Sequence, residues 1–251
     1  MAIRRQSGSK SDKWRKMRVL ARSSVCRQHI PQTKIFSYAA LKAMLSSFRS
    51  VYIKPRNGSF GKGIIRVYRT ENGYLTHIGT HVKRHGSFDM MYSFITSKIS
   101  GSKYIIQRAI NSIKYQGSIV DFRVVVQINE SGRAEVTGIA GRVSQNNRVV
   151  SNGNGGGAVG DLESFFSGRQ YEYVKRKLHT LALYVMAQVR KAYPRQTEIG
   201  VDIAVDNNLK VWIIEHNYRP DHRMFTIIDN KYYLRRIAQL GARNGRRYRL
   251  G

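Results

Sequence analysis

A loop that joins two apolar strands through three glycines constrains the fold of this chain more than any other feature. Residues 51–67 read VYIKPRNGSFGKGIIRV, with Lys54 at the end of the first strand and glycines at 58, 61 and 63. A P-loop is excluded because glycine, rather than serine or threonine, follows Lys62. The dinucleotide-binding and kinase patterns need other glycine spacings. The loop is therefore either a flap whose backbone N–H groups fold over phosphates or a plain hairpin turn.

The rest of the chain predicts a mixed α+β protein with several hairpins, rather than a regular alternation of parallel strands and helices. Helices are expected over residues 37–48, 88–99 and 169–192, and in a basic segment at the end of the chain. The third helix carries an apolar face of Leu178, Leu181, Ala182 and Val185. Strands are expected over 51–54, 64–69, 74–79, 103–110, 121–130, 133–143, 198–205 and 210–216.

The charge of the chain is strongly one-sided. Lysine and arginine number 44 against 15 acidic residues, which gives a formal net charge of +29. The basic residues concentrate in residues 1–30 and from Lys231 onward, where we expect contact with a polyanion. A solvated surface explains only part of this bias. A nucleic-acid-binding module is disfavoured because none of its known motifs occurs.

Composition also suggests a cellular setting. With 41% hydrophobic residues the chain should be globular. No apolar run approaches the ~20 residues that span a bilayer, and no signal-peptide pattern follows the basic N-terminus. The single cysteine, Cys26, cannot form an intrachain disulfide and suits a reducing cytoplasm. We therefore expect a cytoplasmic protein without a membrane span.

A second candidate site lies in the C-terminal pair of strands. EIGVDIAVD places Asp202 within an apolar strand, and KVWIIEHNYRP ends the next strand in Glu215, His216 and Asn217. Because side chains alternate along a strand, Glu215 and Asn217 share one face, His216 takes the other, and a hairpin can bring Asp202 opposite. Two carboxylates and an amide oxygen suit Mg²⁺. The alternative is a set of strand-end acids that face solvent.

Two features between these ends fit phosphate chemistry. Arg123 lies within the strand VDFRVVV, on the face opposite Phe122, where a guanidinium can stabilise charge on a transferred phosphate. The loop SNGNGGG, residues 151–157, can close over a site and offers Asn152 and Asn154 as polar contacts. The alternative for this loop is a simple connector.

Together these motifs resemble the ATP-grasp enzymes, and more closely the endospore coat-associated YheC/YheD family. The segments that carry the second resemblance are SDKWRKMRVL, YIKPRNGSFGKGI, DFRVVVQ, VTGIAGRV and WIIEHNYRP. The resemblance spans roughly residues 10–225. It implies an ATP-grasp fold, in which two α+β subdomains with mostly antiparallel sheets grip the nucleotide. The implied division is a basic N-terminal segment (1–35), a subdomain with the glycine flap (36–110), a subdomain with the metal site (111–225) and a basic C-terminal helix and tail (226–251).

The resemblance also implies roles for single residues. Lys54 would hold the α- and β-phosphates, Ser59 and Lys62 would lie in the flap, and Gln107 and Arg108 would bind ATP at the adenine end. Lys13 is the candidate for a second phosphate lysine, in competition with Lys10 and Lys16. Arg123, Arg142 and Asn152 would sit at the transferred phosphate. Asp202, Glu215 and Asn217 would bind Mg²⁺.

The function implied is that of a ligase that uses ATP and Mg²⁺ to phosphorylate a carboxylate, which an amine then attacks. The alternative is a non-catalytic ATP-binding protein that associates with the spore coat or an acidic polymer through its basic ends. Only about 50 residues precede the flap strand, whereas typical ATP-grasp ligases carry a full N-terminal domain there. The carboxylate and amine substrates are therefore not defined by the resemblance.

Overall fold

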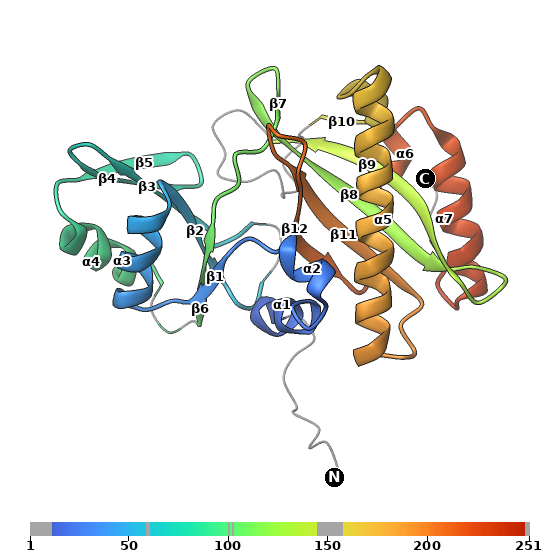
Figure 1. Ribbon diagram of the computed structural model, residues 1–251, viewed down its shortest axis with the longest axis horizontal. Helices are drawn as coiled ribbons and strands as arrows, with labels where there is room; N and C mark the ends of the chain where they lie inside the picture. Colours follow the sequence, from blue (N-terminus) through green and yellow to red (C-terminus); the bar gives the residue numbers. More distant parts are fainter. Residues whose placement is uncertain (1–11, 59–60, 100, 102, 145–157, 249–251) are drawn as a thin grey trace, which may run out of the picture.

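Two six-stranded antiparallel sheets carry the fold of the described part of the chain (Figure 1). The computed structural model describes residues 12–58, 61–99, 101, 103–144 and 158–248. The first sheet has the order β1 (Thr33–Ile35), β6 (Tyr104–Arg108), β2 (Ser50–Pro55), β3 (Ile65–Thr70), β4 (Gly73–Ile78) and β5 (His81–His85). The second has the order β10 (Val159–Gly160), β9 (Ala134–Val143), β8 (Ser118–Ile128), β11 (Glu198–Val205) and β12 (Val211–Asn217), with β7 (Lys114–Tyr115) paired to β8.

One face of the first sheet is covered by α3 (Tyr38–Ser47) and α4 (Phe88–Lys98). Ser37 begins α3 as an N-cap, its side chain accepting a hydrogen bond from the backbone N–H of Ala40. Alternation along β2 points Val51 and Ile53 into the core beneath these helices. Lys54 therefore emerges on the opposite face, which is directed toward the second sheet.

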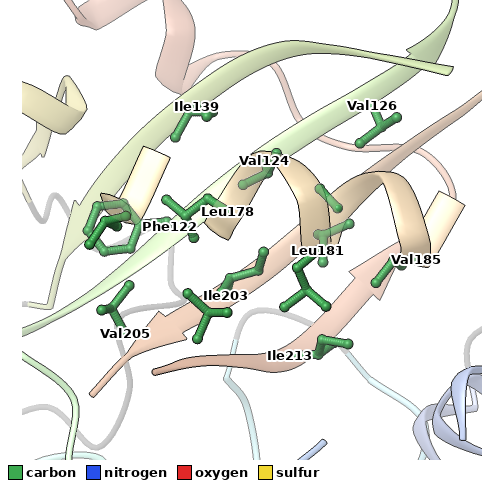
Figure 2. Close-up of a cluster of buried hydrophobic side chains, with 14 of the residues drawn as sticks. Phe122, Val124, Val126, Ile139, Leu178, Leu181, Val185, Ile203, Val205 and Ile213 are labelled. Atoms are coloured by element: carbon green, nitrogen blue, oxygen red, sulfur yellow. The ribbon is translucent and has the colours of Figure 1, made fainter. Parts of the chain in front are cut away.

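The second sheet packs one face against the long helix α5 (Gly168–Ala192), and Figure 2 shows the core between them. Helix residues spaced three and four apart, including Leu178, Leu181 and Val185, meet alternate residues of the strands, such as Phe122 and Ile203. The intervening strand residues, among them the candidates at positions 123 and 202, therefore lie on the face away from α5.

That second face is divided between two coverings. Over β8 and β9 it is covered by α6 (Met224–Ile227) and α7 (Lys231–Arg243), which enclose a separate apolar cluster with Val125 and Phe225. Over β11 and β12 the face turns toward the first sheet instead. The short helix η1 (Leu162–Ser164) lies before α5 and adds Leu162 to the core.

The N-terminal helices α1 (Lys13–Leu20) and α2 (Ser24–Gln28) connect the two sheets. Figure 1 shows α1 beneath β12, between the first sheet and α5. Gln188 of α5 donates a 3.0 Å hydrogen bond to the carbonyl of Val19, and Asp12 pairs with Arg56 just after β2. One short helix is thus attached to both halves of the molecule.

The α+β class with mostly antiparallel sheets is confirmed, and so is the apolar face of α5. The helices α1 and α2 and the strands β1 and β5 were not predicted from the sequence, and β8 begins three residues earlier than predicted, at position 118 instead of 121. In α1 and β5 the many basic residues make the apolar periodicity hard to recognise in the sequence. The strand β5 reads HVKRH and is an exposed edge strand, which needs little apolar character.

Candidate functional site

A buried lysine on the first sheet forms one side of the site. Lys54 donates a 2.6 Å hydrogen bond to Oε1 of Gln107, on the neighbouring strand β6, and both side chains are buried. Burial, the largest cause, lowers the pKa of Lys54 from 10.5 to about 8. The carboxylate of Glu215 opposes this shift and the ammonium of Lys13 adds to it. A positive charge at Lys54 is therefore poorly compensated, and an anion beside it would be stabilising.

The second sheet contributes a buried network of arginines and aspartates. Arg123 on β8 lies directly across from Asp202 on β11, and its Nε and Nη2 atoms donate hydrogen bonds of 2.5 and 3.1 Å to the two carboxylate oxygens. Arg142 on β9 lies 3.1 Å from Asp202 and 2.6 Å from Asp121. This arrangement follows from strand alternation, which puts all four side chains on the face away from α5.

Charge compensation within this network fixes the ionisation of its members. Burial by itself would raise the pKa of Asp202, but the guanidinium groups of Arg123 and Arg142 bring it below its usual range. Burial acts to lower the pKa of Arg142, and its two aspartate partners more than offset this and raise it. Asp202 therefore stays an anion and Arg142 a cation.

The end of β12 presents a second set of oxygen atoms. Asp202 and Glu215 are paired in register across β11 and β12, as the hairpin interpretation expected. Lys16 of α1 lies with its Nζ 3.0 Å from Oε1 of Glu215 and 3.5 Å from Oδ1 of Asn217. Glu215 and Asn217 therefore do point the same way. Among the described residues, no group of three or more His, Cys, Asp or Glu side chains is placed to hold a metal ion.

His216 occupies the opposite side of the same strand. It pairs in register with Val201, a core residue beneath α5, and its ring packs edge-on against Tyr218 with centroids 5.1 Å apart. Burial, with a contribution from Lys16, lowers the pKa of His216 to about 3, so the imidazole is neutral at pH 7. A neutral, buried ring is a packing residue rather than a titrating group.

The two sheets and α1 meet at one cavity. It has a volume of about 20 Å³, which is room for a single water molecule. Its lining includes Lys54 and Gln107 from the first sheet, Glu215 and His216 from the second, and Lys13 and Lys16 from α1. Charged groups that are far apart in the sequence thus converge on one point between the sheets.

The other predicted site residues are placed less centrally. Lys13 donates a 2.6 Å hydrogen bond from Nζ to the carbonyl of Gly58, at the start of the glycine loop. Lys62 is exposed. The guanidinium of Arg108 lies 5.0 Å from the ring centroid of Phe48 and 5.4 Å from that of Trp212. Ser59 and Asn152, like Asn154 and Lys10, lie outside the described residues.

The comparisons with known proteins identify the family. A model of the YheC/D-like ATP-grasp family matches residues 6–241, so the chain belongs to this family and its α+β architecture is an ATP-grasp fold. The endospore coat-associated protein YheD of Bacillus subtilis is 29% identical over 228 residues, which cover 86% of this chain and 49% of YheD. YheC of the same organism is 25% identical over 220 residues, which cover 84% of this chain and 60% of YheC. The chain therefore spans half to three-fifths of these curated relatives.

Solved structures agree on the fold. The crystal structure of the D-cycloserine synthetase DcsG superposes with a TM-score of 0.61 at 14% identity, covering 93% of this chain and 69% of that one. At this identity the likeness shows the fold alone. None of the helices in the described part of the chain combines the length and the apolar character that crossing a bilayer requires.

The position of Lys16 was predicted least well, because the sequence suggested this residue only as an alternative to Lys13 for the second phosphate lysine. The sequence does contain a signal for the helix that carries Lys16. Asp12 can cap a helix, and Trp14, Met17 and Leu20 follow at a three-residue spacing. In the structure the Asp12 side chain does accept hydrogen bonds from the backbone N–H groups of Trp14 and Arg15. A helix that starts there turns Lys16 toward β12.

Proposed function

We propose that this chain is an ATP- and Mg²⁺-dependent ligase of the ATP-grasp type, which activates a carboxylate as an acylphosphate for attack by an amine. One observation carries the proposal: a buried, poorly compensated lysine on one sheet faces the Glu215 carboxylate of the other across a small cavity. Asp202 is paired with Glu215 in register, and the Asn217 amide oxygen shares the Lys16 ammonium with it, so three oxygen donors form a cluster there. Membership in the ATP-grasp family supports the proposal. The lysine suits phosphate oxygens, and the oxygen cluster suits a divalent cation.

The chemistry would proceed in two steps. A carboxylate oxygen of the first substrate attacks the γ-phosphorus of ATP, the bond from phosphorus to the bridging oxygen breaks, and ADP leaves. The amine nitrogen of the second substrate then attacks the acyl carbon, phosphate leaves, and the nitrogen loses a proton to give an amide. The protein needs no covalent nucleophile for this sequence, so its task is to position groups and to stabilise charge.

The roles of the phosphate-binding residues follow from their positions. Lys54 would contact the α- and β-phosphates, and Lys13 would bring a second ammonium to the glycine loop, which it already contacts at Gly58. Lys62, Ser59 and Asn152 are proposed to complete the phosphate contacts. Arg123 and Arg142 would stabilise charge at the transferred phosphate.

The adenine end would lie near the last residues of β6. Gln107 and Arg108 are proposed to bind there, beside an apolar cluster that includes Ile110, Ala204 and Trp212. Arg108 lies over the Trp212 ring, and a flat aromatic base could add to such a stack. The cavity of about 20 Å³ is smaller than a nucleotide, so binding would require the two sheets to separate.

Asp202, Glu215 and Asn217 are proposed as the metal ligands. Their donors are hard oxygens, which fits Mg²⁺, and the register of β11 and β12 places the two carboxylates opposite each other. Mg²⁺ bound there would neutralise negative charge on the phosphates during transfer. The guanidinium groups of Arg123 and Arg142 keep Asp202 ionised, and Lys16 forms an ion pair with Glu215.

A proton-uptake experiment follows from the lowered pKa of Lys54. Between about pH 8 and pH 9, where a lysine with a pKa of about 8 is partly or mostly neutral, ATP binding should take up a proton. The uptake should vanish near pH 6, because Lys54 is already protonated there. Calorimetric titrations in buffers with different ionisation enthalpies measure this number directly. The Lys54→Met variant is the control, and an unchanged proton uptake in it would assign the effect elsewhere.

From the family we propose a link to the spore coat and synthesis in the cytoplasm. We also propose that the N-terminal segment contacts a polyanion. Arg18 on α1, Arg22 in the following turn and Arg27 on α2 are exposed. By contrast, Arg236 and Arg246 near the C-terminus form ion pairs with Glu130, Glu135 and Glu198, so part of the tail charge is compensated within the fold. The test is binding to polyglutamate at rising salt concentration, which should weaken an electrostatic contact. Binding that does not change with salt would rule this contact out.

The experiment that tests the ligase proposal is a screen for ADP release. Mg²⁺ and ATP are supplied with pairs of amino acids or peptides, because the substrates follow from neither the fold nor the site. The expected result is ADP formation that depends on both an amine and a carboxylate. ATP binding without turnover on any substrate pair would favour the alternative of a non-catalytic ATP-binding protein.

A further inference from the structure

Lys16 occupies an unusual position for a lysine. It lies on α1, is only 6% exposed, and makes its ion pair with a residue 199 positions away in the sequence. Its Nζ atom is 3.0 Å from Glu215 and 3.5 Å from Asn217, and it lies 5.7 Å from the centroid of the Tyr218 ring. A buried ammonium is costly unless it is paired, so these contacts account for its placement.

The oxygen atoms that Lys16 contacts are those proposed as metal ligands. An ammonium and a divalent cation cannot both occupy the space in front of Oε1 of Glu215 and Oδ1 of Asn217. Lys13, one helical turn earlier, contacts the carbonyl of Gly58 instead and leaves these oxygens alone. The conflict with a metal ion therefore concerns Lys16 alone among the lysines whose contacts the structure describes at this cavity.

We propose that Lys16 is a tethered cation that holds Glu215 and Asn217 in the absence of metal, and so sets the affinity of the site for divalent cations. The inference rests on the proposed function, since it assumes that these oxygens bind Mg²⁺. Without nucleotide, a metal ion must displace the Lys16 ammonium from its partners. With nucleotide bound, phosphate oxygens offer that ammonium a new partner, so metal and nucleotide bind with positive cooperativity.

The attachment of α1 makes this displacement relevant to the glycine loop. Asp12 pairs with Arg56, and the backbone N–H of Lys13 donates a 2.8 Å hydrogen bond to the carbonyl of Arg56, so the start of α1 is fixed to the residues after β2. Release of Lys16 removes an attachment of the same helix to β12. Metal loading would therefore remove one attachment of α1 to the second sheet, while Asp12 keeps the helix paired with Arg56 and the Gln188–Val19 hydrogen bond keeps it on α5.

The test uses Mn²⁺ as a substitute for Mg²⁺, with free Mn²⁺ followed by electron paramagnetic resonance in the absence of nucleotide. Lys16→Met should bind Mn²⁺ about tenfold or more tightly than the wild type, because a positive charge within ~4 Å of the ligands is removed. Arg18→Met is the matched control: it removes a positive charge from an exposed position on the same helix and should leave the affinity within about twofold. Equal or weaker Mn²⁺ binding by Lys16→Met would overturn the proposal.

Two further variants keep the outcome interpretable. If Lys16→Met does not fold, Lys16→Gln retains a polar donor toward Glu215 and carries the same expectation of tighter binding. Combining Lys16→Met with Glu215→Gln should abolish the gain. Should Mn²⁺ bind the double variant as tightly as it binds Lys16→Met, Glu215 would not be a metal ligand, and the proposed metal site itself would fail.

Discussion

Replacing Arg123 by methionine is expected to lower the free energy of unfolding by about 3–5 kcal/mol. The guanidinium makes two hydrogen bonds to Asp202, and the side chains of this pair are 8% and 2% exposed. The substitution leaves a buried carboxylate with one of its two cationic partners. Arg142, 3.1 Å away, still compensates part of the charge, which favours the lower end of the range. Urea denaturation at pH 7 measures the change.

An exposed pair of the same chemistry provides the control for this prediction. Arg223 and Asp221 form an ion pair in which the side chains are 67% and 46% exposed. Arg223→Met should leave the urea midpoint unchanged within error, because solvent screens the pair. An equally small effect of Arg123→Met would mean that the Arg123–Asp202 pair contributes no more than a surface pair, and the buried network would lose its structural role.

Replacing Glu215 by glutamine is expected to reduce ADP release by about 10²-fold or more while the protein stays folded. Glutamine keeps the volume of the side chain but removes the negative charge that a metal ligand requires. Glu71→Gln, at an exposed turn on the first sheet, should leave the rate unchanged. The measurement is steady-state ADP release at saturating Mg²⁺ and ATP with the best substrate pair.

The fold of the apo Glu215→Gln variant must be checked separately, because Lys16 loses its anionic partner. Its melting temperature without ligands should fall only slightly, since an amide oxygen still accepts a hydrogen bond from the ammonium. A normal rate of ADP release in Glu215→Gln, together with an inactive His216→Ala variant, would reverse the assignment of the two faces of β12.

Sequence patterns predicted those parts of the fold that depend on local periodicity. The face of α5 that carries Leu178 and Leu181 is buried as expected, because an apolar stripe at helical spacing leaves water when that face of the helix packs against a core. The hairpin of β11 and β12 was also expected, but the pairing of Asp202 with Glu215 depends on a β-bulge between Asp202 and Ile203, which no sequence pattern indicated. What the patterns predicted thus depends on residues close together in the sequence.

Contacts between distant segments were beyond the sequence patterns. Arg123 and Asp202 face each other because β8 and β11 pair in one register among several that alternation allows, and no local signal selects it. The ion pair of Lys16 with Glu215 likewise depends on α1 docking between the sheets. Since charge alone does not locate a partner in a chain of net charge +29, the actual partners of these groups required the structure.

The chain is expected to bind Mg²⁺ and ATP between its two sheets through Lys54 and Glu215, and a melting scan with and without Mg-ATP measures this binding. At a ligand concentration about 100 times the dissociation constant, binding to the folded state alone adds ~2.7 kcal/mol, which corresponds to a rise of about 5–10 °C in a domain of this size. The predicted result is such a rise for the wild type, a smaller one for Lys54→Met, and a smaller one when EDTA removes the metal. An unchanged melting temperature at millimolar Mg-ATP would mean that this binding does not occur.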